Sequence, residues 1–331
     1  MARKAYGDIA ITVIRDTDAV MVPCGIPYIY GTLRCTSKNV IPDKMLVDAK
    51  IDLVVGTVVK IDKENKVVTT KENETYSYKK LVIATGSLPI IPTLIHRNEL
   101  ENVFPIYKNQ DYLASILEKL DKAESVAVIG GGFIGVEFAE QISLLGKKVT
   151  LVEMADACLW QAFDKSYTDE IENMMKDNNI NVLTNTKVKK ILGTKSVEAL
   201  ELENGEKIAA DLVILGLGVR PNGILAKEAG LDVNAKGAIV VDQYTRTSDP
   251  DIFAVGDCAE KKCFFTHKDV PVLLASTAAM EAKIAGSNAF QLRLIRANKA
   301  TISAFSTKIF GRTFAAAGMT EGLQFCCGDG R

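Results

Sequence analysis

The segment from Ser125 to Glu153 constrains the fold more than any other part of this sequence. An apolar run at residues 126–129 leads into the turn GGGFIG at 130–135, and a second apolar run at 149–152 ends at Glu153. The pattern predicts a strand, a tight turn, a helix over 136–145 and a second strand with an acid at its tip. Repeated units of this kind build a doubly wound α/β sheet.

The glycine spacing also predicts what the turn binds. In a GxGxxG turn Gly130 permits the tight bend, Gly132 lets the backbone approach a pyrophosphate, and Gly135 lets the helix pack closely on the strand. The positive end of the helix dipole then faces the phosphates. Glu153 would accept a hydrogen bond from a ribose 2′-hydroxyl and repel a 2′-phosphate, so we predict NAD(P)H binding with NADH preferred. The alternative is a glycine-rich turn without a ligand.

Composition excludes several other kinds of partner. The formal charge is −1, from 40 basic and 41 acidic residues, and this balance provides no field that would attract nucleic acid or an anionic membrane. No apolar run approaches the roughly 18 to 20 residues of a membrane-spanning helix, and the first residues lack the apolar core of a signal peptide. We therefore expect a cytoplasmic protein with small-molecule partners, and a length of 331 residues predicts two domains or slightly more.

The cysteines do not form a recognisable framework. There are seven, at positions 24, 35, 158, 258, 263, 326 and 327, and no two of them have CxxC spacing. With only two histidines in the chain, neither a zinc site nor a set of structural disulfides is indicated. We predict reduced thiols and no bound metal.

Alternating strands and helices continue on both sides of the glycine turn. Strands are predicted at 9–14, 81–84, 181–183, 211–215, 238–241 and 251–255, ribbons at 53–70 and 197–208, and helices at 110–120, 165–177 and 276–294. This order predicts an α/β protein with two Rossmann-like, doubly wound domains. From residue 301 the sequence no longer continues this order, and a new pattern of apolar and polar residues extends over 302–314.

Five motifs occur in a fixed order along the chain. They are PCGIPY at 23–28, ATGS at 84–87, GGGFIG at 130–135, LGVRPN at 217–222 and TSDPDIFAVGD at 247–257. Together they resemble the FAD-dependent pyridine nucleotide–disulfide oxidoreductases, and in particular their single-cysteine branch of coenzyme A disulfide reductases and NADH oxidases. The resemblance covers nearly the whole chain.

This resemblance implies FAD and NAD(P)H as cofactors and assigns roles to individual residues. The cofactor-binding residues that it implies are Thr85, Gly86, Gly130, Gly132, Gly135, Glu137, Glu153, Gly218 and Asp257. Asp257 would bind the ribityl chain of FAD, and Glu137 would lie near the nicotinamide and the flavin. From the residues alone, Asp257 follows an apolar strand, so it is either a ligand at the carboxyl edge of a sheet or a turn cap.

The resemblance also implies a division into domains. Residues 1–108 would be the first part of an FAD-binding domain that lacks its first strand and glycine loop, and residues 109–236 would bind NAD(P)H. Residues 237–299 would complete the FAD-binding domain, and 300–331 would begin an α+β interface domain that supports a homodimer in full-length relatives. By this comparison the chain is expected to be truncated at both ends.

Cys24 is the predicted catalytic residue. Pro23, Gly25 and Pro27 restrict the backbone around it, and no second cysteine lies within one turn. The implied reaction passes electrons from NADH through FAD to Cys24, which forms a mixed disulfide with a small thiol such as coenzyme A or reduces polysulfide. Two alternatives are an oxidase or peroxidase that cycles Cys24 through a sulfenic acid, and a catalytically silent NAD-binding fragment.

Overall fold

The computed structural model describes residues 1–92, 100–292 and 297–320. The chain forms two compact units, and each is assembled from separated stretches of sequence. Unit 1 comprises residues 1–18, 42–88 and 219–303, and unit 2 comprises residues 19–41, 89–218 and 304–331.

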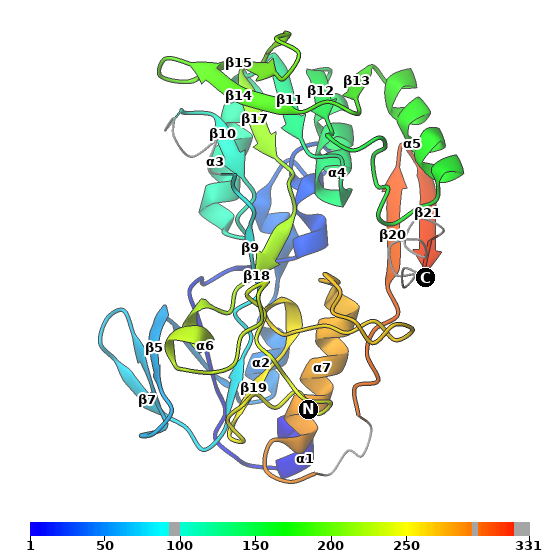
Figure 1. The fold of residues 1–331 in the computed structure, drawn as a ribbon. Coiled ribbons are helices and arrows are strands. Elements are labelled where there is room, and N and C mark those ends of the chain that lie inside the picture. Colours follow the sequence, from blue (N-terminus) through cyan, green and yellow to red (C-terminus); the bar gives the residue numbers. More distant parts are fainter. Residues whose placement is uncertain (93–99, 293–296, 321–331) are drawn as a thin grey trace. The chain divides into compact units, whose positions relative to one another are not determined.

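A five-stranded parallel sheet forms the centre of unit 2 (Figure 1). Its strands, in spatial order, are β10 (Val103–Pro105), β17 (Leu212–Leu215), β11 (Ser125–Ile129), β12 (Lys148–Val152) and β13 (Ile180–Leu183). The central strands β11 and β17 are buried along almost their whole length. Their continuous apolar sequence suits a parallel sheet that is covered on both faces.

Alternation along β11 divides the core of unit 2 into two layers. Val126 and Val128 pack among the apolar side chains of the helices, whereas Ala127 and Ile129 pack against a second sheet. The helices are α3 (Gln110–Lys122), α4 (Phe133–Ser143) and α5 (Lys165–Asp177), and the second sheet is antiparallel, with β14 (Val188–Gly193), β15 (Val197–Leu202) and β16 (Lys207–Ala209). The parallel sheet is therefore the middle of three layers. The residues at the carboxyl ends of its central strands are buried, whereas Gly132 at the start of α4 is exposed.

The remaining elements of unit 2 are short. The early segment contains β2 (Val20–Met21), β3 (Val40–Ile41) and the 3₁₀ helices η1 (Pro23–Gly25), η2 (Pro27–Ile29) and η3 (Thr36–Asn39). The last described segment is the antiparallel hairpin of β20 (Ala304–Ile309) and β21 (Arg312–Ala317). Phe310 and Gly311 connect these strands, both with positive φ, as a tight two-residue hairpin requires.

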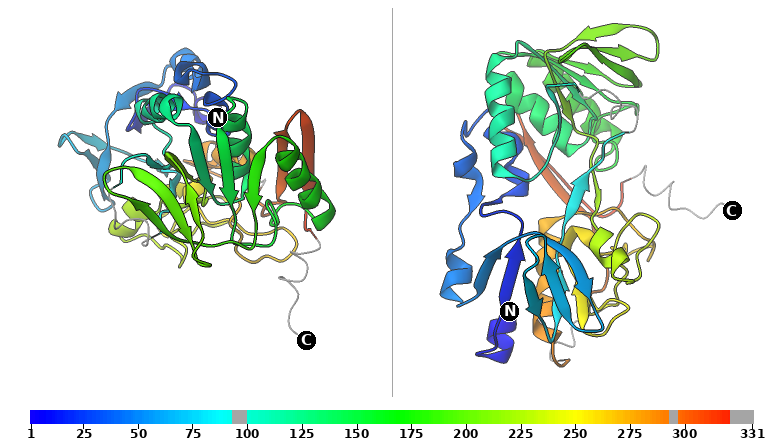
Figure 2. Two further views of the ribbon diagram at one scale, coloured as in Figure 1. Left: turned by 90° about the horizontal axis from the view of Figure 1, so that it is seen from above. Right: turned by 90° about the vertical axis from the view of Figure 1, so that its left-hand side faces the viewer.

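Unit 1 contains two separate parallel strand pairs and an antiparallel sheet (Figure 2). The pairs are β1 (Thr12–Arg15) with β4 (Asp52–Val55), and β8 (Leu81–Ile83) with β19 (Ile252–Ala254). The antiparallel sheet is β5 (Val58–Asp62), β6 (Val67–Thr70) and β7 (Thr75–Ser77), and β9 (Ser87–Pro89) pairs with β18 (Val219–Pro221). The helices are α1 (Ala2–Tyr6), α2 (Lys44–Asp48), α6 (Ile224–Glu228), α7 (Ala275–Asn288) and the 3₁₀ helix η4 (Gly256–Cys258).

Several element boundaries differ from the predicted ones. The first strand begins at Thr12 rather than residue 9, and the carbonyl oxygen of Ile9 accepts a hydrogen bond from the Arg3 side chain. The predicted ribbon at 53–70 is divided at Gly56, and its first part pairs with β1 in parallel instead. Residues 238–241 are not a strand, since only Ile239 forms isolated bridges.

The helices show the same pattern of agreement and shift. α5 has the predicted bounds, whereas α4 begins three residues earlier than predicted, directly after Gly132. α7 ends at Asn288, short of the predicted end at 294, and residues 293–296 lie outside the described part of the chain.

Candidate active site

The three glycines of the predicted nucleotide turn lie between β11 and α4. Gly130 has φ +106°, and a Cβ atom there would lie 2.6 Å from the carbonyl oxygen of Gly216. A Cβ at Gly135 would lie 1.8 Å from the carbonyl oxygen of Gly130, so close packing of helix on strand requires this glycine. A Cβ at Gly132 would meet no heavy atom within 4 Å.

The open space at Gly132 coincides with the start of α4. Gly132 is the N-cap of this helix, and no side chain caps its first amide groups. Free amides at a helix start bind anions, and the helix dipole adds to the attraction. The packing of the protein does not require Gly132 to be small, and the open space is compatible with the predicted approach of a pyrophosphate.

Glu153 follows β12 and lies beside the same turn. Its Oε2 accepts a hydrogen bond from the Gly131 amide at 2.5 Å, and its Oε1 accepts one from the Ala155 amide at 2.7 Å. Each carboxylate oxygen has a further lone pair available to a hydroxyl donor. The two backbone bonds therefore hold the carboxylate beside the glycine turn, and its role toward a ribose remains a prediction.

The two lysines nearest the start of β12 do not offset the charge of Glu153. Lys147 donates to the carbonyl oxygens of Asp121 and Ala123 at the end of α3. Lys148 begins β12, whereas Glu153 follows its opposite end, a separation of roughly 16 Å at the usual rise per residue of a strand. The predicted preference for NADH is therefore not weakened by these two lysines, and it remains a prediction.

Cys24 is exposed and lies in the middle of η1, with its thiol free. The amide of Gly25 and the Asn39 side chain both donate to the carbonyl oxygen of Val22, at 3.0 Å each. A Cβ at Gly25 would lie 1.9 Å from Asn39 Oδ1, so this position must be a glycine for Asn39 to hold the turn. Sequence reasoning missed Asn39, because its role depends on the pairing of β2 with β3.

α4 packs against the segment that carries Cys24. The rings of Tyr30 and Phe138 lie 5.1 Å apart, and Gln141 Oε1 accepts hydrogen bonds from the amide and the hydroxyl of Thr32. Gly31 lies against the backbone of Gln141, where a Cβ would come within 2.3 Å of the carbonyl oxygen. One helix therefore begins at the nucleotide turn and continues along the cysteine segment.

Glu137 and Glu140 lie on α4 and contact the β20–β21 hairpin. Glu137 accepts a hydrogen bond from the Thr307 hydroxyl at 2.8 Å, and Glu140 accepts one from the Phe310 amide at 2.6 Å. Burial raises the pKa of both carboxyl groups. Burial also raises the pKa of Tyr28, and the negative charges of Glu137, Glu140 and Cys24 contribute, so the phenol remains a hydrogen-bond donor.

The predicted FAD-side residues come together at the carboxyl ends of β8 and β19 in unit 1. The Thr85 hydroxyl donates to the carbonyl oxygen of Asn222 at 2.6 Å, and the Asn222 amide donates to the carbonyl oxygen of Gly86 at 2.9 Å. Asp257 lies in η4, and its Oδ2 accepts a hydrogen bond from the Ser87 hydroxyl at 2.8 Å. The motifs at 84–87, 219–222 and 247–257 thus meet at one edge.

Two glycines among the predicted cofactor-binding residues, Gly86 and Gly218, have backbone conformations that favour glycine. Gly86 has φ +67° and Gly218 has φ +82°, and a Cβ at either would meet no heavy atom within 4 Å. The space beside both residues is therefore open. It is compatible with the cofactor-binding roles predicted for them, which remain predictions.

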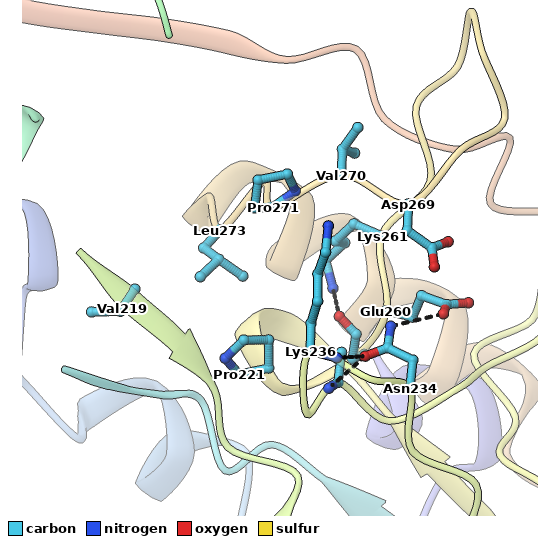
Figure 3. Close-up of a pocket in the computed structure, with 12 residues that line it drawn as sticks. Val219, Pro221, Asn234, Lys236, Glu260, Lys261, Asp269, Val270, Pro271 and Leu273 are labelled. Carbon is cyan, nitrogen blue, oxygen red and sulfur yellow. Dashed lines mark hydrogen bonds between the residues drawn. The ribbon is translucent and has the colours of Figure 1, made fainter. Parts of the chain in front are cut away.

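A shallow pocket of about 50 Å³ lies near this edge of unit 1 (Figure 3). Its polar wall includes Asn234, whose side chain donates to Glu260 at 2.9 Å, together with Lys236 and Asp269. Pro221 and Leu273 supply apolar surface. The volume suits one or two water molecules rather than a dinucleotide, so we assign no ligand to this pocket.

Within the described ranges, no three His, Cys, Asp or Glu side chains are grouped as a metal site would require. Cys326, Cys327 and His96 lie outside these ranges. No described helix is long and apolar enough to cross a membrane. The cytoplasmic location remains a prediction.

Comparison with known proteins decides the family. Residues 2–284 match a family model described as pyridine nucleotide-disulphide oxidoreductase. The chain belongs to this family. Its members depend on FAD and NAD(P)H, which confirms the predicted resemblance and cofactor class.

Particular relatives of the oxidoreductase family agree in sequence and fold. The chain is 35% identical over 273 residues to an NAD(P)H coenzyme A polysulfide/persulfide reductase of Pyrococcus horikoshii, and this match covers 80% of the chain and 60% of the relative. It is 34% identical to an NADH oxidase of Enterococcus faecalis, over 79% of the chain and 59% of the relative. The chain thus spans about three fifths of the length of these relatives.

The structure of an NAD-dependent persulfide reductase from A. fulgidus has a TM-score of 0.91 to this chain at 31% identity, and covers 98% of the chain and 62% of that protein. The predicted fold class, with two Rossmann-like FAD/NAD(P)-binding domains, is confirmed by these likenesses. The domain boundaries and the roles of individual residues remain predictions.

The residues described here fit the two cofactors to different extents. The turn at 130–135 provides the open glycine, free helix amides and anchored carboxylate that NAD(P)H needs. For FAD, Asp257 and Gly86 of unit 1 match the contacts predicted for the ribityl chain and the flavin. The sequence contains the GxGxxG pattern only once, in unit 2, so it has no second glycine turn to match the FAD pyrophosphate.

Proposed function

We propose that this chain is the nucleotide-binding and cysteine-bearing part of an NAD(P)H-dependent flavoprotein oxidoreductase that reduces a small disulfide such as coenzyme A disulfide or a polysulfide. The observation that supports this most directly is the position of α4. The helix begins at the nucleotide turn of Gly132, and its body packs on the segment that presents the exposed Cys24. The helix that begins at the proposed nucleotide site thus packs against the segment of the candidate redox thiol.

The residues around the nucleotide turn would bind and orient the reductant. The α4 amides would bind the pyrophosphate, and Glu153 would select NADH by accepting from its 2′-hydroxyl. FAD, when bound, supplies a two-electron relay between the nicotinamide and a thiol. Asp257, held by the Ser87 hydroxyl, would accept from the ribityl hydroxyls of that cofactor.

Cys24 would carry out the sulfur chemistry. Its thiolate attacks one sulfur of a disulfide RSSR, which forms a Cys24–SR bond and releases RS⁻. Two electrons from NADH and one proton from solvent then reduce this mixed disulfide. The products are the Cys24 thiolate and RSH. The net reaction is NADH + H⁺ + RSSR → NAD⁺ + 2 RSH. Cys24 is exposed, so its sulfur is accessible to a small disulfide.

An oxidase reaction is the second candidate, and the relatives give it specific support. The match to the Enterococcus faecalis NADH oxidase is nearly as strong as the match to the Pyrococcus reductase. In that reaction a peroxide would oxidise the Cys24 thiol to a sulfenic acid and release water or an alcohol. Two electrons from NADH and two protons would then restore the thiol and release the sulfenic oxygen as water. The same exposed cysteine serves either acceptor.

A third candidate is a chain that binds NAD(H) without turnover. The chain spans about three fifths of the relatives it matches, and its sequence has a single GxGxxG turn. Binding of FAD therefore separates the two enzyme proposals from this one.

The test begins with reconstitution. The purified chain is incubated with FAD and desalted, its visible absorption is recorded, and NADH consumption is followed with coenzyme A disulfide, oxygen or peroxide as acceptor. We expect a retained flavin band and faster NADH consumption with the disulfide than with oxygen. No flavin band and no NADH consumption would favour the silent fragment, and turnover only with oxygen or peroxide would favour the oxidase.

The Cys24→Ser variant then tests the cysteine. We expect it to lose disulfide reduction by at least about 100-fold, because serine cannot form the mixed disulfide. Cys35→Ser is the matched control, since Cys35 lies in the same unit and should be dispensable. Disulfide reduction that survives in Cys24→Ser would remove Cys24 from the mechanism.

A further inference from the structure

A buried ion pair lies directly behind the turn that presents Asp257. Lys261 Nζ and Glu281 Oε2 are 3.1 Å apart, and their side chains are 3% and 1% exposed. Lys261 follows η4 by three residues, whereas Glu281 comes from the middle of α7. A fully buried lysine is rare in proteins, and burying both charges carries a desolvation penalty that their attraction only partly offsets. A specific structural role would explain such a pair.

The pair binds the backbone of the turn from two sides. The Gly256 amide donates to Glu281 Oε2 at 2.9 Å, and Lys261 Nζ donates to the Gly256 carbonyl oxygen at 2.6 Å. Lys261 Nζ also donates to the carbonyl oxygen of Ala259 at 2.8 Å. Both polar backbone groups of Gly256 are thus held by one ion pair. Gly256 has φ +75°, and because glycine can adopt many backbone conformations, these hydrogen bonds restrict a flexible residue to one of them.

The carboxylates of Glu281 and Asp257 both lie near this turn and repel each other, and the Lys261 ammonium offsets this repulsion at Glu281. Burial raises the pKa of Glu281, with a contribution from the charge of Asp257, and the Lys261 ammonium and the Gly256 amide oppose this effect. Glu281 Oε1 is buried and has no hydrogen-bond partner within the described part of the chain. Lys261 is therefore the cation that permits two carboxylates to lie near one turn.

We propose that Lys261 and Glu281 are positioning residues that set the direction in which the Gly256 turn presents Asp257 to FAD. This inference rests on the proposed function for its cofactor, but the geometry of the turn can be tested without it. The ion pair acts through the backbone groups that it binds, at Gly256 and Ala259. Its removal should therefore affect the turn even in the protein without FAD.

The variants separate charge from size. Lys261→Met leaves Glu281 without its cation, and Glu281→Gln retains an oxygen acceptor for the Gly256 amide. The double variant, Lys261→Met with Glu281→Gln, removes both charges and keeps the side-chain volumes similar. It should therefore reverse the decrease in thermal unfolding midpoint that Lys261→Met causes. Lys262→Met is the matched control, because Lys262 is adjacent in sequence, is half exposed and pairs with Glu260 and Asp269 instead.

The first measurement is hydrogen exchange of the peptide spanning residues 254–259 in the protein without FAD. We expect at least about tenfold faster exchange in Lys261→Met and in the double variant, and no change in Lys262→Met. The second is the FAD dissociation constant from flavin fluorescence, which should rise at least about tenfold in both variants that lack Lys261.

The outcomes distinguish this inference from the proposed function. Wild-type exchange in the double variant would overturn the inference, and so would wild-type FAD affinity in a double variant with a recovered midpoint. An equal effect of Lys262→Met would show a general charge effect and would also overturn it. Absence of FAD binding by the wild-type chain would count against the proposed function alone, and the exchange result would then decide the inference.

Discussion

Gly130, Gly132 and Gly135 lie in one turn, but a side chain at each would meet different surroundings. At Gly130 and Gly135 it would collide with backbone carbonyl groups, whereas at Gly132 it would enter open space. The first and third glycines are thus required by packing. The middle glycine is compatible with a larger residue in the protein alone, which makes it a selective probe of ligand binding.

We expect Gly132→Val to weaken NADH binding by at least about tenfold, measured by isothermal titration, because its side chain would occupy the space of the pyrophosphate. Loss of stability should be at most about 1 kcal/mol, the usual effect of a poorer N-cap residue. Gly135→Val is the contrasting variant and should destabilise the protein by several kcal/mol through overpacking. An unchanged NADH dissociation constant in a folded Gly132→Val protein would reject the assignment of this turn to the phosphates.

The Glu153 carboxylate leads to a second prediction at this scale. We expect Glu153→Gln to lower the preference for NADH over NADPH by about tenfold, because the amide neither repels a 2′-phosphate nor accepts as strongly from the 2′-hydroxyl. The dissociation constants of both nucleotides provide the measurement. Asp156→Asn is the control for a general loss of negative charge, since Asp156 is exposed three residues further on. Equal ratios in wild type and Glu153→Gln would mean that another residue reads the ribose.

At the scale of elements, α4 connects three parts of unit 2. Its first residue follows the nucleotide turn, one side packs on the segment of Cys24, and its two glutamates bond the β20–β21 hairpin. Glu137 was predicted to lie near the nicotinamide, and its hydrogen bond to Thr307 shows an additional structural contact. The hairpin, in turn, places its backbone amide at Phe310 within reach of Glu140.

The pH dependence of this contact can be predicted from Glu140. Burial raises its pKa above the ordinary value of 4.5, so the folded state binds a proton more tightly than the unfolded state does. The contribution of protonated Glu140 to the free energy of unfolding is then complete below pH 4.5, and it decreases as the pH rises through the raised pKa. Glu140→Gln retains an acceptor for the Phe310 amide and has no charge to bury.

We therefore expect the stability of Glu140→Gln, relative to wild type, to increase between pH 4 and pH 7 by on the order of 1 kcal/mol. Urea unfolding at several pH values, followed through Trp160, is the measurement, because this single tryptophan lies in unit 2. The control is Glu118→Gln, an exposed position on α3. A stability difference that does not change with pH would contradict the prediction.

At the scale of the whole molecule, the two units differ in how their parallel strands are organised. Unit 2 has a five-stranded parallel sheet with a layer on each face, whereas the parallel strands described in unit 1 occur as two separate pairs. The nucleotide turn and Cys24 belong to unit 2, and Asp257 belongs to unit 1. Retention of FAD therefore tests the role of Asp257 in unit 1, while NADH binding tests the nucleotide turn in unit 2.

The sequence by itself determined the elements whose signal is local. Glycine spacing and apolar runs predicted the βαβ unit at 125–153, and the alternation of strands and helices that follows it predicted α5 with its observed bounds. The turns at Gly132 and Asp257 were also recognisable, because the residue types that a tight turn needs are few. The ligand-binding roles of both residues remain predictions. The family, the fold class and the cofactor class followed from these patterns.

Only the tertiary structure showed which distant segments meet. The parallel pairing of β1 with β4, the contact of α4 with the Cys24 segment, and the hold of Glu281 on Gly256 all join residues that are far apart in sequence. Neither Lys261 nor Glu281 has a distinctive local pattern, since isolated charged residues usually lie on the surface. Their burial depends on how η4 and α7 pack together, and packing between separated segments is decided by the folded chain as a whole.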